Sequence, residues 1–80
     1  MGTKNNPGRF DCYANAEPDE EMFILLARDW DAPALVEAWA NRREQAIEYG
    51  KKPISDCEMV AEARECAAKM REYRAKRGSA

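Results

Sequence analysis

The side chains that could perform chemistry in this sequence are carboxylates and thiols. Paired carboxylates can act as general acid and base, as in glycosidases, and clustered carboxylates can bind calcium. Thiolates can hold zinc or attack a substrate. Six carboxylates fall within fifteen residues, at Glu17, Asp19, Glu20, Glu21, Asp29 and Asp31, and the three thiols stand at Cys12, Cys57 and Cys66.

The sequence lacks the companion groups that most of this chemistry requires. It contains no histidine, which removes the usual general base, every Ser–His or Cys–His pair and the commonest zinc ligand. The cysteines form no C-x-x-C clamp, no glycine-rich phosphate loop is present, and the acids lack the alternation and central glycine of a calcium-binding loop. We therefore expect no enzyme, no metal site and no cofactor.

The cysteine count and the lack of long apolar runs indicate a cytoplasmic protein. Three thiols cannot all pair, and Cys57 and Cys66 face opposite sides of one expected helix, because nine residues make two and a half turns. No apolar run reaches the roughly 18 residues that a membrane span needs, and the first ten residues hold no apolar signal core. We expect reduced thiols and no membrane contact.

The formal net charge is −2, and one block carries the acidity. Residues 17–31 hold six acids against Arg28, a net charge of −5. A chain without net basicity is a poor nucleic-acid binder, because phosphate neutralisation drives that binding. Two basic clusters are interpreted as solvated helix faces, with a nucleic-acid footprint as the alternative. They comprise Arg42, Arg43, Lys51 and Lys52, and then Arg71, Arg74, Lys76 and Arg77.

The chain of 80 residues makes one domain, for which the apolar spacing predicts an all-α fold. A short helix and an antiparallel helical hairpin form a small helical domain over residues 17–77. An irregular, extended N-terminal arm over residues 1–16 covers them, and residues 78–80 form a frayed C-terminus. Phe10 and Tyr13 indicate that the arm packs across the helices, with a disordered tail as the alternative. So small a core is marginal, and a homodimer is compatible with it.

Two helices make up the expected hairpin. The first runs from about residue 32 to 49, and Trp39 on its apolar stripe is expected in the core. The second runs from about 56 to 76 and begins at a capping box formed by Ser55 and Glu58. Alanines on the facing surfaces predict a close contact. The N-cap, first-turn proline and C-cap of the first helix are Asp31, Pro33 and Gly50.

A third, short helix is predicted over residues 18–28. Pro18 can open a helix at its first turn, and the acids that follow suit the positive end of the helix macrodipole. The run Met22-Phe23-Ile24-Leu25-Leu26 is apolar all round, so we expect it to be buried. A buried strand over residues 22–27 is the alternative, because short apolar runs do not distinguish the two structures.

The acidic block has two interpretations. As helix-end electrostatics, its first acids serve one helix N-terminus and Asp31 caps the next, while Trp30 plugs the corner between the helices. This leaves Glu17 and Asp29 unexplained. As a functional surface, the block meets a basic partner surface, and Trp30 is an exposed aromatic anchor. The partner-binding residues are then Glu17, Asp19, Glu20, Glu21, Asp29, Trp30 and Asp31.

A family resemblance rests on three motifs: Phe10-Asp11-Cys12-Tyr13, Glu17-Pro18-Asp19-Glu20 and Leu25-Leu26-Ala27-Arg28-Asp29. Over roughly residues 5–70 the chain is similar to small proteins encoded by phages and prophages of proteobacteria, which have no activity we can name. Similar sequences are expected to have proline where Glu21 stands and often near Trp30. The resemblance implies a genomic setting in which compact, non-enzymatic inhibitors of host defence are common, anti-CRISPR proteins among them.

We therefore expect a phage-type inhibitor that acts in the host cytoplasm. It would bind a bacterial immunity complex through the acidic patch, by steric blockade or by mimicking DNA. The first alternative is a sponge for signalling nucleotides, in which a base stacks on Tyr13 or Trp30 and arginines hold the phosphates. The second alternative is a nucleic-acid-associated accessory protein, which the net charge of −2 disfavours. The arginines of the first alternative are Arg9, Arg28, Arg42 and Arg43.

Overall fold

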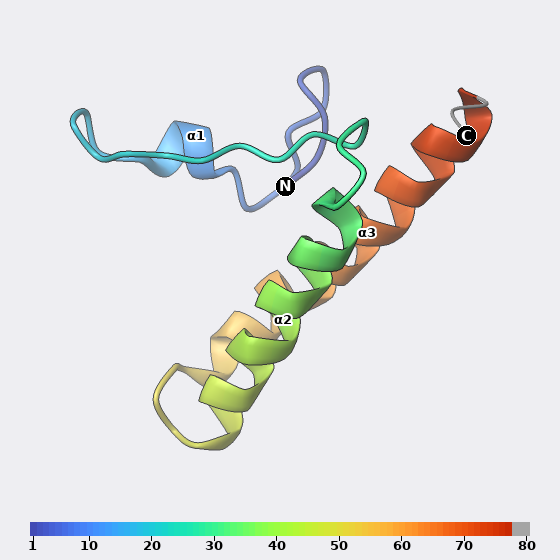
Figure 1. Cartoon of the computed structure of the whole chain (residues 1–80). Helices are drawn as coiled ribbons and strands as arrows, with labels where there is room; N and C mark the ends of the chain where they lie inside the picture. The colour runs from blue at the N-terminus through green and yellow to red at the C-terminus, as the bar shows by residue number, and fades with distance from the viewer. Residues whose placement is uncertain (78–80) are drawn as a thin grey trace.

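A computed structural model describes residues 1–77, and two long helices dominate it (Figure 1). Helix α1 spans Cys12–Asn15, α2 spans Ala32–Glu48, the 3-10 turn η1 spans Ile54–Asp56 and α3 spans Cys57–Lys76. The described residues contain no strand, so the all-α expectation is confirmed. The fraying expected at residues 78–80 lies outside the part of the chain that the structure describes.

Helices α2 and α3 pack against each other as the expected hairpin (Figure 1). The core between them consists of small residues, chiefly Ala40, Val60 and Ala63, which lets the two backbones approach closely. No large side chain is fully buried among residues 1–77. Trp39, which we expected in the core, is instead 38% exposed, and the guanidinium of Arg43 lies 5.1 Å from its ring centroid.

Two ion pairs across the hairpin fix its register. Arg71 donates two hydrogen bonds to Glu37, at 2.7 and 2.8 Å, and Arg64 donates two to Glu44, both at 3.1 Å. The two acids lie seven residues apart on α2, and the two arginines lie seven apart on α3, which is two helical turns on each side. The hydrogen bonds from Arg71 and Arg64 lower the pKa values of Glu37 and Glu44.

Helix α2 ends as the sequence predicts, at Gly50. This glycine has a φ of 75°, a conformation that residues with a Cβ atom rarely adopt. Its N–H donates to the carbonyl of Ile47 at 3.0 Å, and the N–H of Lys51 donates to the carbonyl of Ala46 at 2.8 Å. These two hydrogen bonds form a Schellman motif, which satisfies carbonyls at the end of the helix that would otherwise be unpaired.

The beginnings of the long helices differ from expectation. Pro33 lies in the first turn of α2 as predicted, but Asp31 at the N-cap accepts no capping hydrogen bond through its side chain. No capping box forms at α3, because η1 moves the start of the helix past Ser55 and puts Asp56 at the N-cap. The Asp56 carboxylate accepts a hydrogen bond from Arg43 at 2.9 Å, which ties the hairpin loop to α2.

The short helix predicted over residues 18–28 is wrong, and so is the buried strand. Residues 20–26 have no regular secondary structure, and Met22, Phe23 and Ile24 are 48%, 87% and 63% exposed. A helix of about ten residues is marginal in water unless its apolar face packs against something. Because alanines line the contact between α2 and α3, the hairpin offers these large side chains no internal space. The apolar run therefore stays outside the core.

The N-terminal arm contacts the hairpin through its first ten residues. Met1 packs against the core and Phe10 is half-buried, which confirms that this part of the arm lies on the helices. Tyr13, in contrast, is 73% exposed, and within the described chain α1 packs against neither α2 nor α3. Residues 11–24 project to one side of the hairpin instead of covering its seam (Figure 1).

Glu62 on α3 anchors the arm. Its carboxylate accepts hydrogen bonds from the backbone N–H groups of Arg9, at 3.3 Å, and Phe10, at 3.1 Å. The terminal ammonium of Met1 lies 3.2 Å from the same carboxylate. Burial raises the pKa of Glu62, but the hydrogen bonds from Phe10, the ammonium and Arg9 outweigh burial, so the pKa lies below its ordinary value.

This anchor predicts a pH dependence that the substitution Glu62→Gln removes. Because folding lowers the pKa of Glu62, its contribution to stability is complete above the ordinary value of 4.5 and is lost as the pH falls through the folded value. At pH 7 the free energy of unfolding of E62Q is expected to lie about 1–2 kcal/mol below that of the wild type. The two free energies should converge as the pH falls below the ordinary pKa of 4.5, as measured by urea unfolding followed by circular dichroism.

Glu65→Gln is the matched control for E62Q. Glu65 also lies on α3, but among residues 1–77 its carboxylate pairs with Lys69 alone, at 2.9 Å on the surface. E65Q should therefore unfold like the wild type at pH 7. A gap between E62Q and the wild type that does not change with pH, or an equal gap in E65Q, would contradict the anchoring role.

The small residues between the helices predict a limit on side-chain size. Ala63→Leu should lower the free energy of unfolding by about 2–3 kcal/mol, because the larger side chain forces α2 and α3 apart. Ala68→Leu adds the same atoms at an exposed position of α3 and should change stability by less than about 0.5 kcal/mol. Thermal unfolding compares the two variants, and equal melting temperatures would show that the seam is not closely packed.

Candidate functional site

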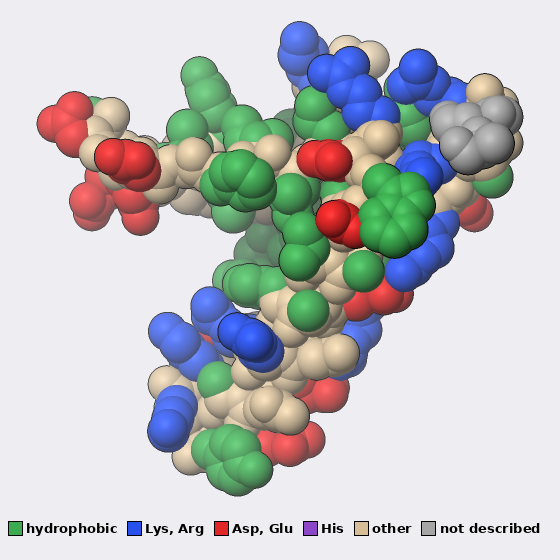
Figure 2. All heavy atoms as spheres, viewed as in Figure 1, with side chains coloured by type: hydrophobic (Ala, Val, Ile, Leu, Met, Phe, Trp, Pro, Cys, Tyr) green, Lys and Arg blue, Asp and Glu red, His purple; other side chains and the backbone are tan. Residues whose placement is uncertain are grey.

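The outermost part of the candidate site is an acidic turn. Glu17, Asp19, Glu20 and Glu21 are all exposed, and acidic side chains gather at the tip of the projecting chain (Figure 2). The N–H of Glu20 donates to the carbonyl of Glu17 at 3.1 Å, and the N–H of Glu17 donates to the Glu20 carboxylate at 3.0 Å. These local hydrogen bonds close the turn, which brings four carboxylates together.

An apolar stretch, residues 22–26, leads back from the acidic turn toward the hairpin. Only Leu25 of these five residues is half-buried, and the others are exposed. Within residues 1–77, the backbone groups of residues 21–25 form no hydrogen bond. Both the side chains and the backbone of this stretch are therefore accessible to another molecule.

The third part of the site lies where the chain enters α2. Trp30 is 75% exposed, so its interpretation as a plug between two helices is wrong. Its carbonyl accepts a hydrogen bond from Arg74 of α3 at 3.2 Å, and the N–H of Asp29 donates to the carbonyl of Leu26 at 2.9 Å. These bonds fix the backbone around Trp30 and leave the indole ring and the neighbouring carboxylates of Asp29 and Asp31 in solvent.

The absence of a helix over residues 18–28 changes the interpretation of the acids. Asp19, Glu20 and Glu21 precede no helix N-terminus, so the helix macrodipole does not account for them. Asp31 stands at the start of α2 but provides no side-chain cap. Local helix electrostatics therefore explains fewer acids than expected. The predicted partner-binding residues are all exposed, and they form two groups with the apolar stretch between them.

Four of the eight side chains in the two basic clusters make internal contacts. Arg43 and Arg71 form ion pairs across the hairpin, and Arg74 donates to the backbone that precedes α2. The guanidinium of Arg77 lies 5.4 Å from the ring centroid of Tyr73. These contacts favour the interpretation of the clusters as helix faces over that of a free surface for nucleic acid.

The described residues offer few groups for metal or thiol chemistry. Among residues 1–77, no group of three or more His, Cys, Asp or Glu side chains is placed to hold a metal ion. All three cysteines are free in this structure. None of the helices described is both long enough and apolar enough to cross a membrane. What residues 17–31 provide is charge and apolar surface.

Reasoning from sequence identified the acids and Trp30 but missed Met22, Phe23 and Ile24 as members of the same surface. The sequence did contain a signal for them. The apolar run has only five residues, it has no polar face that a surface helix would turn to solvent, and acids bound it on both sides. A stretch of this kind is compatible with an exposed extended segment as well as with a buried helix.

Comparison with known proteins identifies no family for this chain. No protein-family model, curated protein or solved structure matches it. The resemblance to phage-encoded proteins therefore stays a prediction.

The exposure of the apolar stretch predicts how little it contributes to stability. Phe23→Ser should change the free energy of unfolding by less than about 0.5 kcal/mol, because the ring is 87% exposed. Val60→Ala, which removes two buried carbon atoms from the core, should cost about 2 kcal/mol. Urea unfolding of both variants checks this, and a loss in F23S as large as that in V60A would mean that residue 23 is buried after all.

Proposed function

We propose that this chain is a small, non-catalytic protein that binds a protein partner through residues 17–31 and inhibits it by occupying its surface. The observation that carries the proposal is the exposed apolar stretch at residues 22–26, of which Phe23 is 87% exposed. Leaving such side chains in water forgoes the hydrophobic stabilisation that burial would give. Contiguous exposed apolar surface with a polar rim is typical of protein-binding sites.

The arrangement of charge indicates the kind of partner surface. Acids lie on both sides of the apolar stretch, at Glu17–Glu21 and at Asp29 and Asp31, while the stretch itself carries no charge. The matching surface is an apolar groove with basic rims. Opposite potentials would speed the encounter, and burial of Phe23 and Trp30 would supply most of the affinity.

The class of target comes from the sequence resemblance. Complexes that handle nucleic acid have basic working surfaces, because these surfaces hold phosphates. A chain that presents carboxylates beside apolar anchors could occupy such a surface. We therefore propose a bacterial immunity complex as the partner, with the anti-CRISPR mode of action, steric blockade of a nucleic-acid site, as the mechanism.

The nucleotide-sponge alternative predicted from sequence receives less support. Its arginines are distributed over separate contacts: Arg9 pairs with Glu58 at 2.7 Å and Arg43 pairs with Asp56 at 2.9 Å. Tyr13 and Trp30, which would stack on a base, are 73% and 75% exposed. These residues do not converge on one concave site, which a tightly bound nucleotide needs.

A phage-challenge experiment tests the proposed function. Bacteria with an active CRISPR–Cas system that targets a phage would express the protein, and the efficiency of plaquing would be measured. Wild-type protein should restore plaquing. Phe23→Ser combined with Ile24→Ser, and Glu20→Lys combined with Asp29→Lys, should each abolish the restoration, because one pair removes the apolar anchor and the other reverses the charge of the rims.

Lys51→Glu combined with Lys52→Glu is the matched control for charge. Both lysines lie in the loop between α2 and η1, away from residues 17–31, so this variant should inhibit like the wild type. Circular dichroism would establish that every variant is folded. Full inhibition by folded F23S/I24S or E20K/D29K protein would refute the role of this surface, and no inhibition by wild type across CRISPR–Cas types would refute the target class.

A further inference from the structure

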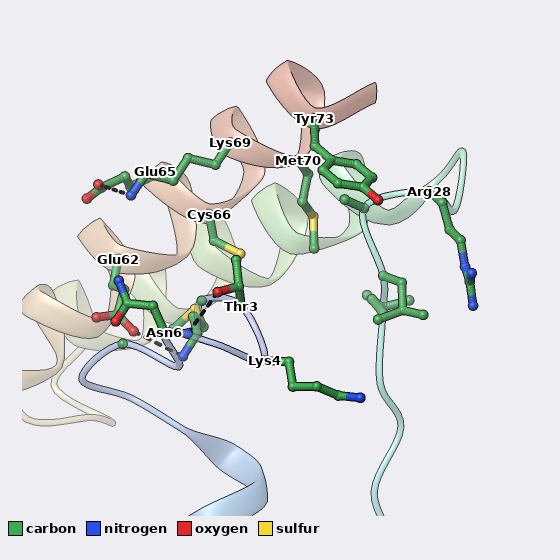
Figure 3. A pocket seen from close by; sticks show the side chains of 16 residues that line it. Thr3, Lys4, Asn6, Arg28, Glu62, Glu65, Cys66, Lys69, Met70 and Tyr73 are labelled. Atoms are coloured by element: carbon green, nitrogen blue, oxygen red, sulfur yellow. Dashed lines mark hydrogen bonds and ion pairs between the residues drawn. The ribbon is translucent and has the colours of Figure 1, made fainter. Parts of the chain in front are cut away.

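A second feature of the molecule is a pocket on the face of α3 that α2 does not cover (Figure 3). It has a volume of about 750 Å³, which is within the range of small-molecule sites in proteins. Three segments enclose it: the N-terminal loop over residues 1–8, the chain over residues 25–28, and one stripe of α3. None of the residues predicted to bind a partner lines this pocket.

The two walls of the pocket are both attached to α3. On one side, the Glu62 carboxylate holds the N-terminal loop through the backbone of Arg9 and Phe10. On the other side, Arg74 donates a hydrogen bond to the carbonyl of Trp30, just beyond the wall formed by residues 25–28. Glu62 and Arg74 lie about three helical turns apart on α3, so the pocket is the space that these two attachments leave between the walls.

The floor of the pocket is apolar. Cys66, Met70 and Tyr73 recur at three- and four-residue spacing on α3, and Leu25 and Leu26 face them from the wall. Figure 3 shows the Met70 side chain extending from α3 into the space between the walls. Burial raises the pKa of the Cys66 thiol, so this side chain is neutral at physiological pH.

The rim of the pocket is cationic. Lys4 extends from the N-terminal loop toward residues 25–28, whereas the Arg28 side chain extends from the opposite wall away from the space between the walls (Figure 3). Neither side chain forms an ion pair within residues 1–77. The two carboxylates of the pocket are already engaged, Glu62 by the N-terminal loop and Glu65 by Lys69. In a protein of net charge −2, this is a local excess of positive charge.

We propose that this pocket binds a small amphipathic anion, a single hydrocarbon chain that ends in a carboxylate or a phosphate. The hydrocarbon would lie on Met70, Leu25 and Cys66, where burial of apolar surface favours it. The anionic group would lie at the rim near Lys4, within the field of Arg28. Lys4 and Arg28 carry positive charges that no ion pair within residues 1–77 neutralises. The apolar floor disfavours small inorganic anions. Leu25, Leu26 and Arg28 belong both to this pocket and to residues 17–31, so the site adjoins the partner-binding surface.

Isothermal titration of the whole purified chain tests the proposal. The probes are decanoate and decyl phosphate below their micelle concentrations, with decanol and decyltrimethylammonium as the neutral and cationic counterparts. Saturable binding of one anion per chain is expected. The affinity for decanol should be at least about tenfold lower than that for decanoate. Equal affinity for decanol and decanoate, or no binding of either anion, would overturn the proposal.

Two double variants and one single variant locate the site. Lys4→Gln combined with Arg28→Gln should weaken decanoate binding about tenfold, whereas Lys51→Gln combined with Lys52→Gln removes the same charge from the far end of the hairpin and should leave it unchanged. Met70→Glu should abolish binding by placing a carboxylate in the floor. Equal weakening by both double variants would indicate non-specific charge attraction and would overturn the assignment.

Co-sedimentation with lipid vesicles tests whether the ligand of the pocket is a free amphiphile or a membrane lipid. Wild-type protein would be sedimented with phosphatidylcholine vesicles that contain phosphatidylglycerol. A pocket for free amphiphiles predicts decanoate binding without co-sedimentation. Co-sedimentation without decanoate binding would overturn the proposal in favour of a lipid surface.

Discussion

The contact between α2 and α3 depends on small side chains, and this constraint determines what the rest of the chain can do. Ala40 and Ala63 are completely buried there, and Val60 is 3% exposed. A seam lined by such residues brings two helices close together but leaves no volume for large side chains. The chain nevertheless contains phenylalanine, tryptophan, tyrosine and leucine residues that no core accommodates. They must lie on the surface, in the pocket or against another molecule.

The chain that precedes the hairpin is held to it at two places. Glu62 binds the backbone of residues 9 and 10, and Arg74 binds the carbonyl of Trp30. Between these attachments, residues 11–24 project from the hairpin, so the acidic turn and most of the apolar stretch are free to meet a partner. The same two attachments hold the walls of the pocket apart. The fold thus positions two adjoining candidate sites with very few interactions.

The two candidate sites have opposite electrostatic character. Residues 17–31 combine exposed apolar side chains with a net charge of −5, which suits a basic protein surface. The pocket combines an apolar floor with two cations that have no internal partner among residues 1–77. Because the charges differ in sign, a ligand suited to one site is repelled by the other. Substitutions outside the shared residues 25–28, such as those at Phe23 or Lys4, affect one site while the other is left intact.

Much of the hairpin could be predicted from the sequence. The three- and four-residue spacing of apolar residues indicated both long helices, Pro33 and Gly50 marked the ends of α2, and alanines indicated the close contact. Residues 18–28 were predicted wrongly because Pro18 and the acids after it resemble a helix start. That resemblance concerns only the local backbone, and a helix this short also needs a surface to pack against.

The sequence by itself therefore determined the elements whose stability is local: the long helices, the turn at Gly50 and the exposed carboxylates. Only the tertiary structure decided where the large apolar residues go, because that depends on the space left between elements far apart in the chain. The same is true of the pocket, whose lining joins Lys4, Leu25 and Met70. The exposure of Phe23 follows from the width of an alanine-lined seam, and the meeting of these three residues follows from the attachments at Glu62 and Arg74. Local spacing reveals neither.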